Sequence, residues 1–127
     1  MKTARVPAGS AGACAAGIAT LQLYRDEDLF ARAARMAPKF ESALHSLKGA
    51  RHVVDVRNIG LVAGIELASR DGAVGARAAE VFQKCWERGL MVRYTGETIA
   101  VSPPLIINED QINEIFHIIR GVLQDVA

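Results

Sequence analysis

Cysteine, histidine and aromatic residues are scarce in this sequence of 127 residues, and their scarcity excludes several kinds of site. The two cysteines, Cys14 and Cys85, lie far apart and outside any CxxC pair, so neither a zinc site nor a disulfide framework is predicted. Both have apolar neighbours at helical spacing, and we expect buried thiols in a reducing cytosol. His45, His52 and His117 have no partner at metal-ligand spacing, and we expect solvated or capping residues.

Long hydrophobic runs and a large excess of one charge are also absent. No segment approaches the roughly 20 consecutive apolar residues of a membrane-spanning helix. The 15 basic and 14 acidic residues are interspersed and give a net charge of +1, which provides no patch for nucleic acid or for an anionic membrane. We therefore expect a soluble, cytoplasmic protein that binds neither.

The N-terminal segment has one feature that favours export. Lys2 and Arg5 precede an Ala/Gly-rich stretch, and residues 11–14 faintly resemble a lipoprotein cleavage site. A signal peptide requires an apolar core of roughly 7–15 residues, whereas Pro7 and several glycines interrupt this one. An exported small protein is therefore the weaker alternative to a cytoplasmic one.

Half of the residues are hydrophobic, and four segments repeat them at the spacing of an amphipathic helix. The first segment runs from Cys14 to Leu21, and its small residues predict that another backbone approaches it closely. The second follows Asp26, its predicted N-cap, and ends at Gly49. Because Pro38 lies inside the second pattern, we expect a kink there or a break between two helices.

The remaining two helices have clearer boundaries. The third ends at Gly89, and the fourth begins at Asn108, which forms a capping-box-like pair with Gln111. The stripes predicted to face the core are Phe30, Ala33, Ala37, Phe40, Leu44 and Leu47 in the second helix; Ala78, Val81, Phe82, Cys85 and Trp86 in the third; and Ile112, Ile115, Phe116, Ile119, Val122, Leu123 and Val126 in the fourth.

Between these helices the apolar period changes from 3.6 to 2, which indicates strands. Residues 54–57 and 61–67 predict two strands around a turn at 58–60, and residues 90–94 and 98–101 predict two more. The order helix, helix, strand, strand, helix, strand, strand, helix predicts one α/β (α+β) domain. We expect a small, mostly antiparallel sheet of about four strands covered by helices.

Local motifs for catalysis are missing: there is no GxSxG elbow, no P-loop and no GxGxxG after a strand. Asp55 and Glu66, the acidic residues within strands, are explained by exposed-face positions. Arg93 stands near the end of a short apolar strand, where its rigid fork would suit a carboxylate. Glu97, across the Thr-Gly turn, provides the alternative that Arg93 is an exposed strand residue paired with it. Local sequence alone favours this alternative.

The string from Arg57 to Leu67, RNIGLVAGIEL, resembles the R-x-x-G-L-x-x-G-I-E-L block of class III aminotransferases, pyridoxal-phosphate enzymes of fold type I. Three further blocks agree in order and spacing. Residues 13–17 resemble the small-residue helix that opens the family's C-terminal portion, residues 89–93 resemble its G-(L/V)-x-x-R strand, and residues 102–105 resemble its closing segment. The resemblance covers residues 13–127 and is greatest to the ω-amino acid:pyruvate (β-alanine:pyruvate) branch.

The resemblance implies that Arg93 takes the position of the family's substrate-carboxylate arginine. The parent reaction moves an amino group from an ω-amino acid or amine to pyruvate. Its Schiff-base lysine and pyridoxal-phosphate cup belong to a larger domain that precedes this segment. None of Lys2, Lys39, Lys48 and Lys84 matches the family's lysine context. No catalytic, cofactor-binding or metal-binding residue is therefore assigned, and we expect the chain alone to be inactive and not to bind the cofactor.

The resemblance stops near residue 12, because the family's T-Y-S-G-H-P-like stretch is missing and Val6 stands at its threonine. We expect residues 1–12 to be an unrelated, flexible start and residues 13–127 to be the aminotransferase C-terminal domain. The leading interpretation is a fragment of a transaminase. The alternative is a stand-alone, non-catalytic module for binding or interaction. Expected partners are an amino acid or keto acid carboxylate, a second copy of the chain, or an aminotransferase subunit.

Overall fold

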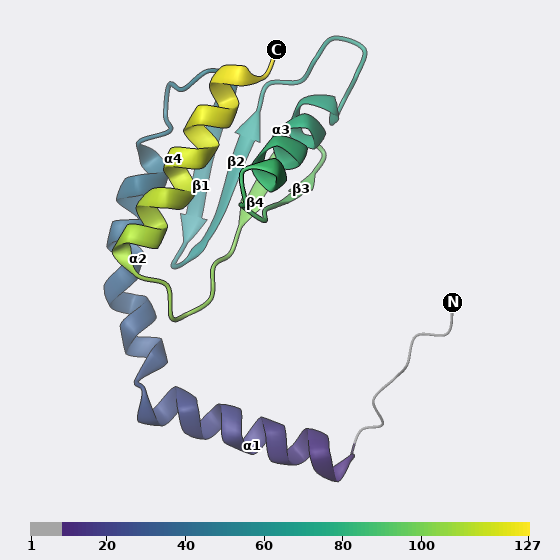
Figure 1. Ribbon diagram of the computed structural model, residues 1–127. Coiled ribbons are helices and arrows are strands. Elements are labelled where there is room, and N and C mark those ends of the chain that lie inside the picture. Colours follow the sequence, from purple (N-terminus) through teal and green to yellow (C-terminus); the bar gives the residue numbers. More distant parts are fainter. Residues whose placement is uncertain (1–8) are drawn as a thin grey trace.

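Two hairpins joined side by side form the sheet at the centre of the fold. The computed structural model describes residues 9–127. In chain order, the elements are α1 (Ala11–Asp26), α2 (Leu29–His45), β1 (Val53–Ile59), β2 (Val62–Leu67), α3 (Ala76–Glu87), β3 (Arg93–Thr95), β4 (Thr98–Val101) and α4 (Glu109–Asp125). The strand order is β1-β2-β4-β3, and every neighbouring pair is antiparallel (Figure 1). This architecture confirms the predicted fold class.

The hairpin turns are short because glycine supplies the left-handed backbone conformation that each requires. Gly60 has φ +55° between the paired residues Ile59 and Val62, and Gly96 has φ +54° between the paired residues Thr95 and Thr98. The second hairpin is shorter than expected. Its first strand begins at Arg93, because the chain before it is extended without ladder hydrogen bonds.

Helices α2, α3 and α4 cover one face of the sheet. Figure 1 shows α3 and α4 in front of the strands, with α2 alongside α4. Phe40 of α2 and Phe116 of α4 meet edge to face in the core, with ring centroids 5.2 Å apart. Alternate strand residues point toward these helices and are buried, namely Val56, Ala63, Ile65, Leu67, Ile99 and Val101. No helix of the described chain covers the opposite face.

Helix α4 agrees with the sequence at both its start and its stripe. Asn108 Oδ1 accepts a hydrogen bond from the Gln111 amide at 2.9 Å, and Gln111 Oε1 accepts one from the Asn108 amide at 3.1 Å. This reciprocal capping box satisfies two backbone donors that would otherwise lack partners. The predicted stripe is buried except for Ile115, which is partly buried.

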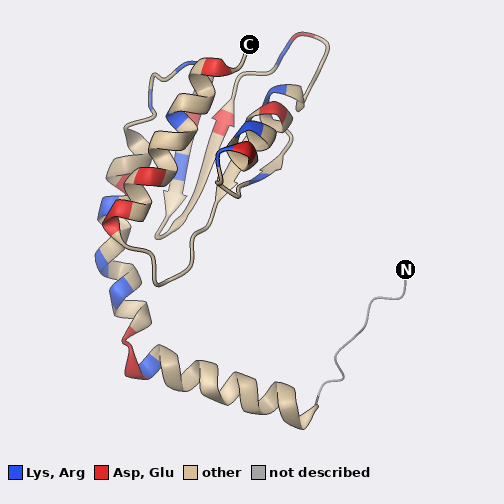
Figure 2. Ribbon diagram, viewed as in Figure 1, with Lys and Arg blue, Asp and Glu red and all other residues tan. Residues whose placement is uncertain are grey.

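Helix α1 differs from the expectation, because it projects away from the rest of the chain (Figure 1). None of its residues is buried, and Cys14 is exposed rather than buried. No atom of the described chain comes within 4 Å of the position that a Cβ would take on Gly17, so no other backbone approaches there. Figure 2 shows that α1 carries charge only at its C-terminal end. The small-residue helix is therefore longer than the predicted segment 14–21, and it meets the rest of the described chain at its C-terminal end, where Tyr24 packs against Phe30 of α2.

Helix α2 begins later than predicted and is not broken. Asp26 ends α1 rather than capping α2, and Asp28 occupies the N-cap position with φ +50° and no side-chain capping bond. Pro38 lies inside one helix that runs from Leu29 to His45. Tertiary packing of the turns beyond the proline compensates for its lost hydrogen bond. The predicted break is therefore wrong.

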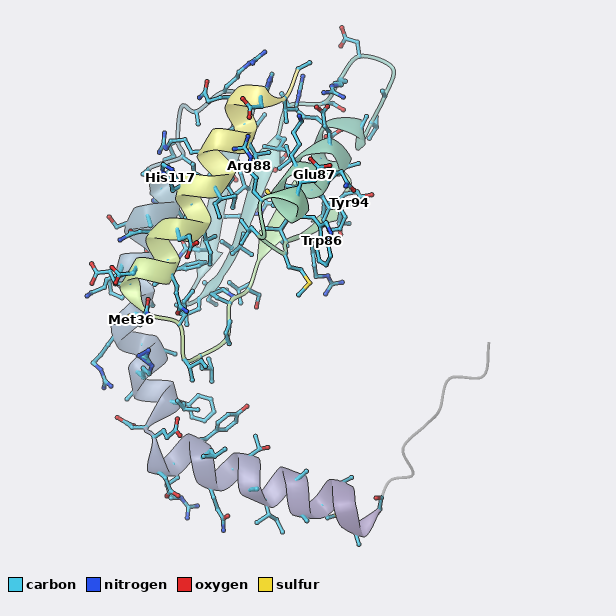
Figure 3. The ribbon with its side chains drawn as sticks, in the orientation of Figure 1. Met36, Trp86, Glu87, Arg88, Tyr94 and His117 are labelled. Carbon is cyan, nitrogen blue, oxygen red and sulfur yellow. The ribbon has the colours of Figure 1, made fainter. Side chains whose placement is uncertain are left out.

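Two aromatic residues expected in the core are on the surface. The exposed fraction of Phe30 is 66%, because the sharp turn at Asp28 directs Leu29 inward instead and leaves Phe30 against Tyr24. The exposed fraction of Trp86 is 59%, because Cys85 takes the buried position in the last turn of α3. Figure 3 shows Trp86 at the end of α3, near Tyr94 of β3. Neither helix stripe is as wide as its periodicity predicts.

Candidate functional site

The candidate site is the uncovered sheet face, on which Arg93 stands. The strand registers align Arg57 of β1 with Gly64 of β2, Gly64 with Ala100 of β4, and Ala100 with Arg93 of β3. Strands lie about 4.8 Å apart, so the two arginine Cα atoms are separated by about 14 Å across the sheet. The two residues between them, Gly64 and Ala100, are small, so no large side chain stands between the two arginines. The sheet thus presents two guanidinium groups at the ends of one row.

The next row of the same face carries acidic and hydroxyl residues. It consists of Asp55, Glu66, Thr98 and Thr95, in the same strand order. Figure 2 shows the resulting blue and red bands on β1 and β2. The prediction that Asp55 and Glu66 occupy exposed-face positions agrees with this register.

Arg57 is held down on this face by the acidic row. Its Nη1 donates to Glu66 at 2.9 Å and to Asp55 at 3.2 Å, and its Nη2 donates to Thr98 Oγ1 at 3.5 Å. These bonds, that with Glu66 most of all, raise the pKa of Arg57 above its ordinary value. The side chain crosses β2 over Gly64, where a Cβ would stand 3.6 Å from Arg57 Nε. Gly64 therefore leaves room for the Arg57 side chain to cross β2 closely.

Arg93 is exposed on edge strand β3, and its guanidinium group makes no hydrogen bond or ion pair with any other residue of 9–127. The alternative that Glu97 pairs with Arg93 is wrong in this structure. The Glu97 carboxylate instead accepts hydrogen bonds from Ser69 Oγ and the Gly75 amide, both at 2.5 Å. Arg93 therefore keeps its full set of donors for a carboxylate from outside the described chain.

The bond from Ser69, then that from the Gly75 amide, lowers the pKa of Glu97 below its ordinary value. Arg77 and Arg70 lie near enough to act in the same direction. Glu97 is therefore an anion that faces the start of α3, on the side of the hairpin away from Arg93.

The described lysines do not form a pyridoxal-phosphate site. Lys39 pairs with Glu109, Lys84 lies 3.9 Å from Glu80, and Lys48 is exposed. A Schiff-base lysine must meet the cofactor in an enclosed site, and none of these three lies in one. Lys2 lies outside the described residues.

The described residues provide no metal site, and His52 and His117 lie apart from one another on different elements. His52 Nε2 lies 3.1 Å from the Val126 carbonyl oxygen, and Figure 3 shows His117 projecting from α4. Over residues 9–127 no group of three or more His, Cys, Asp or Glu is arranged to hold a metal ion. A groove of about 570 Å³ between α2 and α4 lies on the helical side, so it is separate from Arg93.

Sequence reasoning identified Arg93 and missed the ion cluster around Arg57. The signal was present, since a two-residue turn aligns Asp55 and Arg57 of one strand with Glu66 and Gly64 of the next. It was not used because the turn was predicted at residues 58–60, whereas the two residues between the paired Ile59 and Val62 are Gly60 and Leu61, and the predicted turn gives another register.

Comparison with known proteins identifies the family. The model of the aminotransferase class-III family matches residues 8–123. An omega-aminotransferase of Caulobacter vibrioides is 59% identical over 114 residues, which cover 90% of this chain and 26% of the relative. A beta-alanine–pyruvate aminotransferase of Pseudomonas aeruginosa is 36% identical over 91% of this chain and 26% of its own length. The chain therefore spans about a quarter of the length of these relatives.

Solved structures of transaminases share the fold. A transaminase determined with L-alanine superposes with a TM-score of 0.80 and 31% identity, over 85% of this chain and 27% of that one. The adenosylmethionine-8-amino-7-oxononanoate aminotransferase of Methanocaldococcus jannaschii superposes with a TM-score of 0.87 and 27% identity, over 99% of this chain and 30% of that one. No described helix has the length and apolar composition needed to cross a membrane. The chain belongs to the class III aminotransferase family.

Proposed function

We propose that this chain is the C-terminal domain of a transaminase that moves an amino group from an ω-amino acid or amine to pyruvate. Within it, Arg93 binds the carboxylate of the substrate. The proposal is supported by relatives named omega-aminotransferase and beta-alanine–pyruvate aminotransferase. The observation that carries it is the position of Arg93, exposed on the uncovered sheet face and without an internal partner.

The geometry suits this role in two ways. A guanidinium group offers two parallel N–H donors to a carboxylate, and Arg93 has none of them engaged within the described chain. The acidic groups of this face, Asp55 and Glu66, are neutralised in part by Arg57 and lie on β1 and β2, which β4 separates from β3. A carboxylate that approaches Arg93 therefore meets little repulsion from this face.

We further propose that the chain alone is catalytically inactive and does not bind pyridoxal phosphate. The family depends on that cofactor, which acts as an electron sink once a lysine holds it. The chain spans only about a quarter of its relatives, and its described lysines do not fit the cofactor. In the whole enzyme the lysine and the phosphate site would come from another part of the polypeptide, and this domain would contribute the carboxylate-binding arginine.

A second candidate function is a non-catalytic module that binds a carboxylate or pairs with an aminotransferase subunit or a second copy of the chain. Ile59 and Val62 would provide an apolar surface for such pairing, since they are 82% and 50% exposed on the same uncovered face. A true fragment should self-associate or aggregate through that face, whereas an adapted module should be a soluble monomer or a defined dimer. Light scattering of the purified chain distinguishes them. A cytoplasmic location is part of both proposals.

A chimera tests the role of Arg93. Residues 13–127 replace the aligned stretch of the Caulobacter relative, and the chimera is assayed with β-alanine and pyruvate. Arg93→Ala should raise KM roughly 10- to 100-fold, because a charged, two-point hydrogen bond contributes about 1.5–3 kcal/mol. The KM of Arg93→Lys should fall between those of the unaltered chimera and Arg93→Ala. Arg25→Ala, which removes an exposed arginine of α1, is the matched control and should change nothing. An unaltered KM in Arg93→Ala would refute the assignment.

A further inference from the structure

Glu97 stands in the turn between β3 and β4, yet its carboxylate reaches across to another part of the chain. Glu97 Oε1 accepts hydrogen bonds from Ser69 Oγ, in the loop after β2, and from the Gly75 amide, both at 2.5 Å. Gly75 is the N-cap residue of α3. The second oxygen, Oε2, is buried and accepts no hydrogen bond from the described residues. A single side chain thus ties the hairpin to both ends of the segment from Ser69 to Gly75.

Backbone contacts seat the same turn. The Leu67 amide donates to the Glu97 carbonyl oxygen at 2.9 Å. Gly75 has φ +80°, and a Cβ there would stand 3.6 Å from the Gly96 carbonyl oxygen. The start of α3 therefore lies close to the turn, and the positive φ of Gly75 favours glycine at that position.

Strand β3 needs such support because little else holds it. It has three residues, all exposed, and it pairs with β4 alone at the edge of the sheet. Its other contact is between Tyr94 and Phe82 of α3, with ring centroids 5.3 Å apart. Short edge strands with few buried contacts open readily, at free energies well below that of global unfolding.

We propose that Glu97 is the positioning residue for Arg93: by fastening the β3–β4 turn to the loop after β2 and to the start of α3, it fixes the edge strand that presents the guanidinium group. The proposal deepens the proposed function, since it rests on Arg93 as the carboxylate ligand. Glu97 itself touches no substrate.

The charges around Glu97 keep it ionised. Arg77 of α3 and Arg70 of the loop are the cations that face it, and the N-terminus of α3 adds the positive end of a helix dipole. Arg77 also donates to the Ala68 carbonyl oxygen, and both arginines donate to the main-chain oxygen of Ala127. Glu80 forms an ion pair with Arg70 and so reduces the positive charge that Arg70 presents to Glu97. The net surroundings favour an anion at Glu97.

The stabilisation of the β3–β4 turn by Glu97 should be lost in acid. The pKa of the Glu97 carboxyl is lowered from 4.5 in the folded protein, chiefly by Ser69 and then by the Gly75 amide. Its contribution is therefore complete above about pH 4.5 and is lost as the pH falls through the lowered folded-state pKa.

Amide hydrogen exchange of the intact, ¹⁵N-labelled chain tests the proposal. Glu97→Gln at pH 7 should accelerate exchange at Arg93 and Ala100, a β3–β4 pair whose amides bond across the hairpin, by roughly tenfold, with no change at Ile119 of the α4 core. Glu97→Asp, which keeps the charge, should restore part of the protection. The matched control is Glu114→Gln on the exposed surface of α4, which should have no effect. The ratio of Glu97→Gln to wild-type rates should shrink toward one in acid.

Unchanged exchange at Arg93 and Ala100 in Glu97→Gln would overturn the proposal, and so would uniform acceleration that includes Ile119. Sodium propionate added to the same samples separates this result from the role of Arg93. Propionate should shift the Arg93 Nε–H resonance of the wild type, and more weakly that of Glu97→Gln. A wild-type Arg93 resonance that does not shift would refute Arg93 as a carboxylate ligand. If exchange were still accelerated locally in Glu97→Gln, Glu97 would have only a structural role, and the positioning proposal would be overturned as well.

Discussion

Phe40 and Phe30 provide a matched pair for measuring what stabilises this domain. Both lie on α2, and each meets another aromatic ring edge to face. They differ in burial, since Phe40 is 0% exposed in the core and Phe30 is 66% exposed beside Tyr24. The periodicity of the sequence predicts that both face the core. Comparing the two variants therefore also tests whether Phe30 lies at the surface.

Phe40→Ala should lower the free energy of unfolding by about 3–5 kcal/mol, because it removes a buried ring and leaves a cavity. The aromatic pair with Phe116 accounts for about 0.5–1.5 kcal/mol of that loss. Phe30→Ala removes a ring of which only a third is buried, which corresponds to about 0.5–1 kcal/mol. Alanine recovers part of this through its higher helix propensity, by about 0.5 kcal/mol.

Urea-induced unfolding followed by far-ultraviolet circular dichroism measures both changes. The midpoint for Phe40→Ala should fall sharply, whereas that for Phe30→Ala should remain near the wild-type value, with equal slopes for all three proteins. Equal losses in the two variants would refute the reasoning. Such a result would mean that Phe30 is buried in solution, against α1 or against another molecule.

Two smaller predictions concern the thiols and the helix cap. Burial raises the pKa of the Cys85 thiol to about 11, so at pH 8 only about one molecule in a thousand carries the thiolate there. With Ellman's reagent, exposed Cys14 should react at once and Cys85 only after unfolding; two fast thiols would contradict the buried position. Asn108→Ala should lower the free energy of unfolding by about 1 kcal/mol through loss of the capping box. Asn113→Ala, in the middle of the exposed face of α4, should change it much less, and equal losses would exclude a capping effect.

Hairpins and strongly periodic helices could be predicted from the sequence because local chemistry determines them. The glycine turns at Gly60 and Gly96 and the pair Asn108–Gln111 are signals confined to a few neighbouring residues. The stripe of α4 is buried, apart from the partly buried Ile115, because that helix packs against α2 and α3. For these elements, local preference and tertiary packing agree.

The predictions of burial were wrong where burial depends on how one element packs against another. A helix of small residues predicts a close neighbour, but no backbone of the described chain approaches Gly17 of α1, and Cys14 is exposed. Phe30 and Trp86 lie at the ends of their stripes, where a shift of one residue moves a side chain from core to solvent. Periodicity cannot detect that shift, because it measures spacing and not the extent of the surface that a helix meets.

The candidate site shows the same division. The sequence identified Arg93 through its strand and its family resemblance, and register places it on the uncovered face in the same row as Arg57. The direction of the Glu97 carboxylate could not be predicted. It depends on a contact with Ser69 and Gly75, which lie more than twenty residues away in the sequence. Partners that distant follow from the packing of the turn on α3.

Alanine formation by the purified chain tests most directly the proposal that this domain supplies a carboxylate ligand and no catalysis. The chain is incubated with pyridoxal phosphate, β-alanine and pyruvate, and both alanine and the absorbance of a cofactor–lysine adduct are measured. We predict no alanine and no adduct, because the described lysines lie on the surface or in ion pairs. Steady turnover that Arg93→Ala weakens would contradict the proposal and would mean that one of the chain's own lysines holds the cofactor.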